Sequence, residues 1–440
     1  MARRKRLPRE PFEATIESLS PEARGVARID GKVTFIDGTL PGERVLFRYT
    51  DRKRSHDSGR VEEVLEAAPE RVEPDCPHFG VCGGCSLQHM DHAAQVAHKA
   101  ATVTEQLQRI GGVAPEAELP PLTGPLRGYR RRARLGVRWV PAKERVLVGF
   151  RERGTGYIVD TERCPVLHPA IGERLPELAA TLQSLTIYDQ IPQIEVAIGD
   201  EGGALVVRHL APLGPGDAQR LADFGETSGL RIQLQPGGPE SVESLEPDSP
   251  VDLAYDHPGS DVRLSFRATD FVQVNGTLNR AMVERALDWL ALEPGQRVLD
   301  LFCGIGNFGL PIARAGAEVV GVEGEAGLVE RARRNAEVNG LTEQTTFHVA
   351  DLSEPGDSPA WGGRYDSVVL DPARTGAREV LDIVAASGAR RVVYVSCNPA
   401  TLARDAGELV ARWYRLARAG VLNMFPHTDH TEAMAIFERA

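Results

Sequence analysis

The sequence has little cysteine and no long hydrophobic run. Only six of its 440 residues are cysteine, and 18 uninterrupted apolar residues occur nowhere. Six cysteines are too few for a disulfide framework in a chain of this length, which favours metal-binding or catalytic thiols. The missing apolar run excludes a membrane-spanning helix, and no apolar signal core follows the basic N-terminus. We therefore expect a cytoplasmic protein of two or three domains.

The sequence also lacks a positive excess of charge. Its net charge of −11 argues, taken alone, against a nucleic-acid partner, because phosphate binding needs clustered cations. The distribution of charge reverses this interpretation. Residues 1–150 carry 25 basic and 20 acidic side chains, whereas residues 151–440 carry 26 and 42. The excess is densest at residues 127–153, which we interpret as an RNA-binding surface, although a solvated strand face would have the same composition.

Three different patterns of apolar and polar residues follow one another along the chain. Residues 11–66 hold short apolar stretches at intervals of about ten residues, which predicts a five-stranded barrel or sandwich. Residues 126–265 alternate apolar and polar side chains, which predicts a largely antiparallel sheet with a helix near residues 170–185. From about residue 266 onward, apolar strands alternate with long helical patterns, which is typical of a parallel α/β sheet.

A glycine-rich loop follows the first strand of that last region. Residues 297–309 read RVLDLFCGIGNFG, in which the strand runs into a loop with Gly304, Gly306 and Gly309 and then into a helix. Glycines allow the backbone to turn sharply and approach a ligand, and a helix N-terminus adds a positive dipole end. The pattern alone is weak evidence, because enzymes that bind nicotinamide dinucleotides share it.

Polar side chains end the following strands and narrow this interpretation. The second strand ends in Glu323, suited to ribose hydroxyls, and the third leads to Asp351, which we expect beside an adenine edge. The fourth ends in Asp371 and the fifth in Cys397. An open α/β sheet builds its site at these carboxyl ends. A hydride-transfer enzyme has no use for a thiol there, whereas an S-adenosylmethionine methyltransferase can use one.

A thiol and a base together point to methylation of a pyrimidine carbon. C5 of a pyrimidine is a poor nucleophile until a thiolate adds to C6, and a base must afterwards remove the C5 proton so that the thiolate can leave. Cys397 would supply the thiolate and Glu432 the base, with Asp371 binding the uracil edge. The alternatives without a catalytic role are that Cys397 is a buried thiol that only packs in the core and that Glu432 is a solvated surface residue. The apolar residues that flank Glu432 favour instead a final hairpin that closes the sheet.

Six segments in this order resemble the uracil-C5 RNA methyltransferase family. The resemblance implies a Rossmann-like class I methyltransferase domain, a mostly parallel doubly wound sheet, that binds S-adenosyl-L-methionine. It implies Cys397 as nucleophile and Glu432 as base, with Asp371 as a further catalytic residue. The matching segments are ATDFVQVN (268–275), VLDLFCGIGNFGLPIA (298–313), GVEG (321–324), LDPARTG (370–376), SCNPATLARD (396–405) and MFPHTDHTEAM (424–434). The cofactor-binding residues that it implies are Gln273, Phe302, Gly304, Gly306, Asn307, Glu323, Asp351 and Asp371.

The resemblance extends to the N-terminal half. Residues 9–67 are similar to the TRAM domain, an OB-like RNA-binding β-barrel. The four cysteines with the family's iron–sulfur ligand spacing, which imply a [4Fe–4S] cluster, are Cys76, Cys82, Cys85 and Cys164. Zinc remains an alternative for four thiolates, as does a set of thiols without metal. In the family, a helix near residues 93–124 packs on the catalytic domain.

We therefore predict a TRAM barrel (9–67), a central antiparallel β domain with the cluster and an RNA-binding surface (68–265), and a methyltransferase domain (266–440). The predicted function is methylation of C5 of a specific uridine in 23S ribosomal RNA, which the resemblance favours because tRNA-methylating members typically lack the TRAM and cluster segments. We expect unassembled or partly folded RNA as partner, no membrane, and a monomer. The alternatives are another 23S uridine, tRNA, or a non-catalytic RNA-binding iron–sulfur protein.

Overall fold

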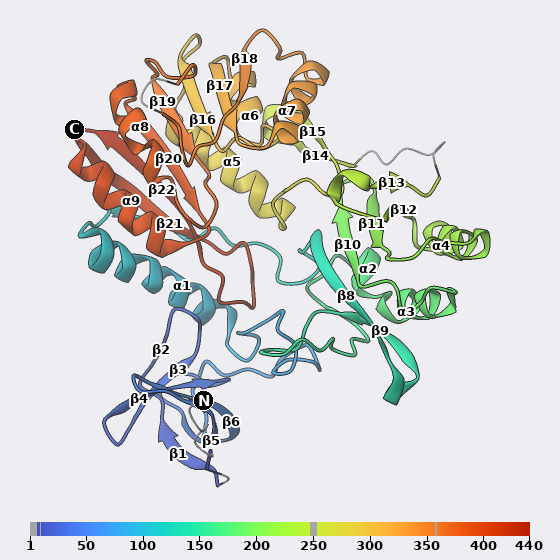
Figure 1. The fold of residues 1–440 in the computed structure, drawn as a ribbon. Coiled ribbons are helices and arrows are strands. Elements are labelled where there is room, and N and C mark those ends of the chain that lie inside the picture. The colour runs from blue at the N-terminus through green and yellow to red at the C-terminus, as the bar shows by residue number, and fades with distance from the viewer. Residues whose placement is uncertain (1–6, 9, 247–252, 357–358) are drawn as a thin grey trace. The chain divides into compact units, whose positions relative to one another are not determined.

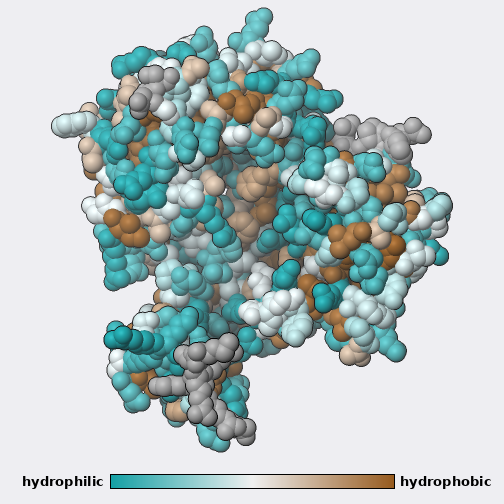
Figure 2. Space-filling model, in the orientation of Figure 1, coloured by the Kyte–Doolittle hydropathy of each residue, from teal (hydrophilic) through white to brown (hydrophobic). Residues whose placement is uncertain are grey.

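The computed structural model describes residues 7–8, 10–246, 253–356 and 359–440. The basic tail at residues 3–6, which the sequence suggests as an RNA-attracting arm, lies outside them. None of the helices in this described part is long and apolar enough to cross a membrane. In the view of Figure 2, apolar surface forms separate patches within a mostly hydrophilic surface. The chain divides into two compact units, and the first comprises residues 1–102, 152–155 and 425–430.

A small β domain forms the start of the first unit (Figure 1). Its strands are β1 (Phe12–Thr15), β2 (Ser18–Leu19), β3 (Gly25–Ile29), β4 (Lys32–Asp37), β5 (Arg44–Arg52) and β6 (Asp57–Glu66). They pair in the order β1-β5-β6-β4-β3-β2. Alternate residues such as Val45, Phe47 and Ile36 point into one core, as the alternating sequence predicts. The sheet has one strand more than expected, because Ser18–Leu19 pairs with β3.

The rest of the first unit is mostly a loop that holds three cysteines. We call residues 67–91 the cysteine loop; it joins β6 to helix α1 (His92–Gln106), which begins in this unit. The Val72 N–H donates to the His89 carbonyl, and Arg71 forms a bridge with Met90, so the two ends of the loop are paired. The buried Glu43 accepts hydrogen bonds from the Leu40 and Ala68 N–H groups and from Arg71, which attaches the loop to the barrel.

The central sheet belongs to the second unit, which comprises residues 103–151, 156–424 and 431–440. Its order is β13-β12-β11-β10-β8-β9. The elements are β8 (Arg132–Val140), β9 (Arg145–Gly149), α2 (Pro169–Gly172), α3 (Leu175–Ser184), β10 (Gln193–Ile198), β11 (Gly203–Arg208), α4 (Pro215–Ser228), β12 (Leu230–Gln235) and β13 (Glu243–Ser244). The sheet is largely antiparallel, as expected, but β11 and β12 run parallel because α4 connects them as a crossover.

The eight-stranded sheet that carries the predicted catalytic residues, which we call the catalytic sheet, has the order β18-β17-β16-β19-β20-β22-β21-β7 (Figure 1). Strands β16 to β20 are parallel, and the chain moves outward in opposite directions from β16 and β19, so these two strands form the topological switch point. The elements are β7 (Ala117–Glu118), α5 (Gly276–Leu290), β16 (Arg297–Leu301), α6 (Gly309–Arg314), β17 (Glu318–Glu323), α7 (Ala326–Val338), β18 (Thr345–Val349), β19 (Ser367–Leu370), α8 (Leu381–Ser387), β20 (Arg391–Ser396), α9 (Pro399–Ala411), β21 (Tyr414–Leu422) and β22 (Glu432–Arg439).

The sequence has helical spacing over residues 91–110, which ends at Gly111-Gly112, and a proline-rich stretch at 113–125, which predicts a connector. The structure agrees with this more closely than with a helix over the whole of the segment near residues 93–124. Helix α1 continues into a π-helical turn, η1 (Leu107–Gly111), and ends where Gly112 adopts a left-handed φ of 63°. The prolines that follow cannot continue a helix, and β7 instead pairs in parallel with β21. The single-turn 3-10 helices among the described residues are η2 (Pro141–Lys143), η3 (Pro239–Ser241), η4 (Pro258–Ser260) and η5 (Arg378–Val380).

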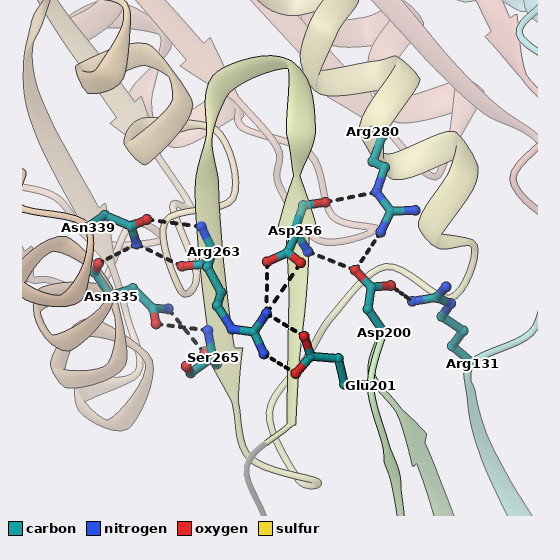
Figure 3. Close-up of polar contacts among 9 residues, drawn as sticks. All are labelled: Arg131, Asp200, Glu201, Asp256, Arg263, Ser265, Arg280, Asn335 and Asn339. Atoms are coloured by element: carbon teal, nitrogen blue, oxygen red, sulfur yellow. Dashed lines mark hydrogen bonds and ion pairs between the residues drawn. The ribbon is translucent and has the colours of Figure 1, made fainter.

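A hairpin of β14 (Leu253–His257) and β15 (Val262–Phe266) lies between the central and catalytic sheets (Figure 3). On its central side, the Asp200 carboxylate accepts hydrogen bonds from Arg131, from Arg280 of α5 and from the Asp256 N–H. Three donors on one carboxylate hold the central sheet, the hairpin and α5 in one arrangement. This attachment matters because the ATDFVQVN segment follows β15 directly.

Two asparagine side chains form hydrogen bonds with the backbone of β15 at the edge of the hairpin (Figure 3). The Asn335 side chain on α7 accepts from the Ser265 N–H and donates to the Ser265 carbonyl. Asn339, at the end of α7, makes the same pair of bonds with the Arg263 backbone. A primary amide offers one acceptor and two donors, so each asparagine can satisfy both backbone groups of a strand residue. Helix α7 therefore takes the place of a further strand beside β15.

Candidate active site

A cavity of about 430 Å³ opens at the carboxyl edge of the catalytic sheet. Its lining comes from the ATDFVQVN segment, the glycine loop after β16, the ends of β17, β19 and β20, the start of β22, and the hairpin. The polar or catalytic-type residues of the lining are Tyr255, Gln273, Cys303, Asn307, Glu323, Asp371, Arg374, Cys397 and Glu432. The topological switch point thus holds a site built from segments far apart in the sequence.

The glycine loop approaches the cavity through left-handed backbone. Phe302, Gly304 and Gly306 have φ angles of 64°, 54° and 93°, which glycine adopts without strain and phenylalanine does not. The Gly304 N–H donates to Glu323 Oε2 at 3.1 Å, and the other Glu323 oxygen accepts from the Gly324 N–H at 2.7 Å. The loop and the end of β17 are therefore attached through one carboxylate that faces the cavity.

Cys397 lies in the tight turn between β20 and α9. Beside it, the Asn398 N–H donates to Ser396 Oγ at 3.1 Å, and the Asn398 side chain caps α9 by accepting from the Ala400 N–H. The same side chain donates to the Arg374 carbonyl at 3.0 Å. The turn is thus held on both sides, which fixes where the half-buried Cys397 thiol lies.

Glu432 reaches the same edge because the last strand runs backwards. Strand β22 is antiparallel to β20, and Ser396 is paired with Ala433. The residue after Ser396 and the residue before Ala433 are therefore neighbours, which brings the Cys397 thiol and the Glu432 carboxyl side by side. Glu432 is buried, at 6% exposure.

Burial and negative charge dominate the electrostatics of the cavity. Burial raises the pKa of the Cys397 thiol, and the Glu432 and Asp371 carboxylates raise it further, whereas the Arg374 charge opposes them. Burial raises the pKa of Asp371 to about 7, against a hydrogen bond from Gln273 Nε2 at 3.5 Å that favours the carboxylate. Burial, reinforced by Asp371, raises the pKa of Asp300 on β16 to about 8. Protons are therefore held in this site near neutral pH.

The structure brings most of the sequence-predicted site residues together. Those lining the cavity are Gln273, Phe302, Gly304, Asn307, Glu323, Asp371, Cys397 and Glu432. Gly306 shapes the glycine loop but does not belong to the lining. Asp351 also lies outside the lining, and its carboxylate accepts hydrogen bonds from the N–H and hydroxyl of Ser353. Its contact with an adenine edge stays a prediction.

Tyr255 and Arg374 line the cavity although sequence reasoning gave them no role. Tyr255 belongs to the hairpin, ahead of the expected start of the catalytic domain at residue 266. Its hydroxyl donates to Asn307 Oδ1 at 2.9 Å, and the same oxygen accepts from Asn279 of α5. The alternation of apolar and polar residues in the sequence does not predict this contact between Tyr255 and Asn307, because it shows only which face of a strand is buried. Arg374 follows Asp371 in the quoted motif, so its charge beside a strand end was a usable signal.

Three of the four predicted metal-ligating cysteines belong to the first unit, and Cys164 belongs to the second. Within the cysteine loop, the Gly84 N–H donates to Cys82 Sγ at 3.3 Å. Burial raises the pKa of the Cys82 thiol, Cys76 raises it further, and the Arg153 charge lowers it. Within the described ranges, His, Cys, Asp and Glu side chains form no group of three or more placed to hold a metal ion. A bound metal therefore stays a prediction.

Comparison with known proteins gives the family. A TRAM domain family matches residues 5–48, and a family described as Methyltransferase domain matches residues 292–412. The 23S rRNA (uracil(1939)-C(5))-methyltransferase RlmD of Alkalilimnicola ehrlichii is 56% identical over 439 residues, which are 99% of this chain and 98% of that protein. The protein of the same name from Nitrosococcus oceani is 53% identical over 441 residues, which are 99% and 98%. The chain belongs to this methyltransferase family.

A solved structure agrees with the family. The Pyrococcus abyssi tRNA (uracil-54, C5)-methyltransferase, in complex with S-adenosyl-L-homocysteine, has a TM-score of 0.74 at 24% identity and covers 97% of this chain and 99% of its own. At this identity the likeness shows the fold. The predicted class I methyltransferase fold with an N-terminal TRAM domain is thus confirmed.

The Asp300 pKa predicts how stability depends on pH. Because the pKa of Asp300 rises from 3.8 to about 8 on folding, the folded protein holds a proton that the unfolded chain releases above pH 4. The contribution of the protonated Asp300 to the free energy of unfolding is therefore lost as the pH rises from about 4 to about 8. We expect the Tm of Asp300→Asn, relative to that of the original protein, to increase as the pH is raised from 5 to 9. Calorimetry measures both Tm values. Asp223→Asn, at an exposed position, is the control. If the Tm of Asp300→Asn changed with pH in the same way as that of the original protein, the raised pKa of Asp300 would be contradicted.

The Cys397 pKa predicts a change in thiol reactivity. Glu432 raises the pKa of Cys397, so Glu432→Gln should increase the thiolate fraction and speed alkylation by iodoacetamide at pH 8 severalfold. The rate is followed by mass spectrometry of the Cys397 peptide. Glu330→Gln, on the exposed face of α7, should leave it unchanged. An unaltered rate in Glu432→Gln would mean that the two side chains do not interact.

Proposed function

We propose that this protein methylates C5 of a uridine in 23S ribosomal RNA, at uracil 1939, the position that its relatives' names give. The observation that carries the proposal is the adjacency of a thiol and a carboxyl at the ends of β20 and β22, beside the glycine loop. An enzyme that methylates nitrogen or oxygen needs only alignment and deprotonation. Only carbon methylation gives both groups a task.

The residues that would hold S-adenosyl-L-methionine are those around the glycine loop. The left-handed turn at Gly304 and Gly306 lets the backbone approach a ligand, and Glu323 presents carboxylate oxygens suited to ribose hydroxyls. Gln273 and Phe302 line the same cavity. When bound, S-adenosyl-L-methionine supplies an electrophilic methyl group. The chain's own residues make the RNA base nucleophilic.

The chemistry begins and ends at the Cys397 sulfur. Its thiolate forms a bond to C6 of the uracil, and the electron pair of the C5–C6 double bond makes C5 nucleophilic. C5 would attack the methyl group of bound S-adenosyl-L-methionine, whose sulfur would keep the electron pair of the broken methyl–sulfur bond. The Glu432 carboxylate then removes the C5 proton, and the C6–sulfur bond breaks to restore the Cys397 thiolate. The Arg374 charge favours the thiolate against the carboxylates that surround it. The target uridine must leave its RNA fold to reach this thiol.

Asp371 is suited to the negative charge that develops on the ring. With a pKa raised to about 7 by burial, a large fraction of this carboxyl is protonated at neutral pH. A neutral carboxyl can donate a hydrogen bond to a ring oxygen as that oxygen gains charge. Gln273, whose amide contacts Asp371 Oδ2, orients the group.

A basic strand supports RNA as the partner. On β8, Arg132, Arg134 and Arg138 alternate with the buried residues of the strand, so the three arginines occupy one face of the central sheet. Arg138 is exposed, whereas the exposed Arg134 pairs with Glu195 of β10 at 2.9 Å and the half-buried Arg132 donates to the Ala268 carbonyl. Arg130 lies over the Phe150 ring at 5.5 Å. Clustered cations of this kind neutralise phosphates without reading sequence. We propose that the protein acts as a monomer on unassembled or partly folded RNA.

We further propose that Cys76, Cys82, Cys85 and Cys164 hold a [4Fe–4S] cluster. An N–H donated to sulfur, as from Gly84 to Cys82, is typical of cluster loops, where such bonds stabilise the ligating thiolate. The Arg153 charge near Cys82 also favours a thiolate. Zinc would suit the same donor atoms, so the choice between them rests on the family resemblance.

The proposed function is tested with RNA that carries 5-fluorouridine at the target position. Fluorine cannot leave C5 as a proton does, so the cysteine adduct should persist through denaturing electrophoresis. We expect the original protein to form this adduct and Cys397→Ala to form none. Cys303→Ala, which keeps the proposed nucleophile, is the matched control. Equal yields from the original protein and Cys397→Ala would rule out covalent catalysis by Cys397.

The cluster is tested by its iron. Protein purified without oxygen should be brown and contain about four iron atoms per chain. Cys82→Ala should lose the colour, whereas Cys303→Ala should keep it, because Cys303 belongs to the glycine loop. A colourless wild-type protein that contains one zinc ion would overturn the cluster and leave the methylation proposal untouched.

A further inference from the structure

A short loop leads into the proposed base. Residues 425–430 read FPHTDH and lie between the end of β21 and the start of β22, whose first residue is Glu432. The pairing of Leu422 with Glu432 closes the turn around them. These six residues belong to the first compact unit, with the cysteine loop and the start of α1. We call them the FPHTDH loop.

Ser86 of the cysteine loop attaches to the FPHTDH loop at three points. The Ser86 N–H donates to the His427 carbonyl at 2.9 Å, and the Leu87 N–H donates to the same oxygen at 2.9 Å. The Ser86 hydroxyl donates to Asp429 Oδ1 at 2.8 Å and accepts from the Asp429 N–H at 2.7 Å. Ser86 directly follows Cys85, so a predicted metal ligand and this attachment are adjacent in the chain.

Helix α1 adds two buried side chains to the attachment. Gln95, at 1% exposure, accepts from the His427 N–H at 2.9 Å. Its amide nitrogen donates to the Leu87 and Met90 carbonyls, so the same side chain fixes the cysteine loop. Lys99, at 0% exposure, donates to the Phe425 carbonyl at 2.9 Å. Hydrogen bonds from buried, charged donors are among the stronger ones in proteins.

The backbone of the FPHTDH loop adopts a strained conformation, which indicates that contacts with other segments fix its shape. His427 has a φ of 67°, in the left-handed region that disfavours a residue with a β-carbon. Such strain persists only where surrounding contacts fix the conformation. The His427 N–H and carbonyl are both held, by Gln95 and by the cysteine loop. The contacts that fix the strained residue are therefore those of Ser86, Leu87 and Gln95.

We propose that the cysteine loop and α1 position the catalytic base, with Ser86 and Gln95 acting on Glu432 through the FPHTDH loop. The inference rests on the proposed function. Glu432 is the first residue of its strand, where pairing frays most easily, and it follows His430 by only two residues. A displacement of about 1 Å can lower a rate by about a hundredfold. Holding the FPHTDH loop rigid keeps the carboxyl within reach of the C5 proton.

The positioning role has a kinetic signature of its own. Glu432 acts only after the thiolate has added to C6, so a misplaced base slows proton removal and release but not adduct formation. Ser86→Ala and Gln95→Met should therefore accumulate a denaturation-resistant adduct with ordinary uridine RNA, which is the result we also expect of Glu432→Gln. We expect release to slow by about tenfold to a hundredfold. Adduct formation with 5-fluorouridine RNA should keep its original rate in these variants, which shows that they are folded.

The experiment measures both rates by denaturing electrophoresis of single-turnover reactions of the full-length protein. Ser184→Ala, at the exposed end of α3, is the matched control and should release RNA at the original rate. Asp429→Ala supplies a second route to the same broken contact if Ser86→Ala folds poorly. Release at the original rate in Asp429→Ala and Gln95→Met would overturn this inference alone. A wild-type protein that forms no adduct with 5-fluorouridine RNA would overturn the proposed function instead.

Discussion

The pairing of β22 with β20 is the constraint on which the site depends. In a parallel sheet every strand delivers its carboxyl end to the cavity, and the start of a strand lies at the opposite edge. An antiparallel strand reverses this rule. With Ser396 opposite Ala433, the end of one strand and the beginning of another meet, so Cys397 and Glu432 become neighbours although 35 positions separate them in the sequence. A shift of this register by one residue would turn Glu432 to the other face of the sheet.

The same arrangement explains the unusual electrostatics. Asp371 interacts with Asp300 on one side and, like the buried Glu432, with Cys397 on the other, and burial raises the pKa of the two aspartates toward neutrality. A cavity of this kind does not favour a resting thiolate, and Arg374 offsets this only partly. Its advantage lies in holding protons. A carboxyl that stays protonated near pH 7 can donate to a ring oxygen, while another carboxyl accepts the proton from carbon.

Much of this site could be predicted from the sequence because it lies at strand ends. Apolar runs that stop at Glu323, Asp371 and Cys397 identify one edge of a parallel sheet, whichever ligand it binds. The early end of the helix beyond residue 111 was also legible in Gly112 and the prolines that follow. The parallel pairing of β11 with β12 was not, because alternation reports which face is buried and not which neighbour is paired.

Contacts between distant segments were beyond sequence reasoning. Ser86 and Asp429 are separated by 343 positions, and neither has a periodicity or motif that identifies the other. Tyr255 likewise enters the cavity from a hairpin that composition assigns to the central sheet. Such contacts depend on how elements pack, and one sequence records that only indirectly. The residues that support the proposed base are therefore found in the structure, whereas the proposed base itself is found in the sequence.

The most direct test of the proposed mechanism is to identify what is attached to Cys397 when the carboxyl of Glu432 is removed. Glu432→Gln would be mixed with ordinary uridine RNA and S-adenosyl-L-methionine, digested with nuclease and protease, and analysed by tandem mass spectrometry. The proposed mechanism predicts that the peptide containing Cys397 carries a uridine nucleotide that already bears the added methyl group, because the methyl group arrives before the proton leaves. An unmethylated nucleotide on that peptide, or a nucleotide attached to another residue, would contradict it.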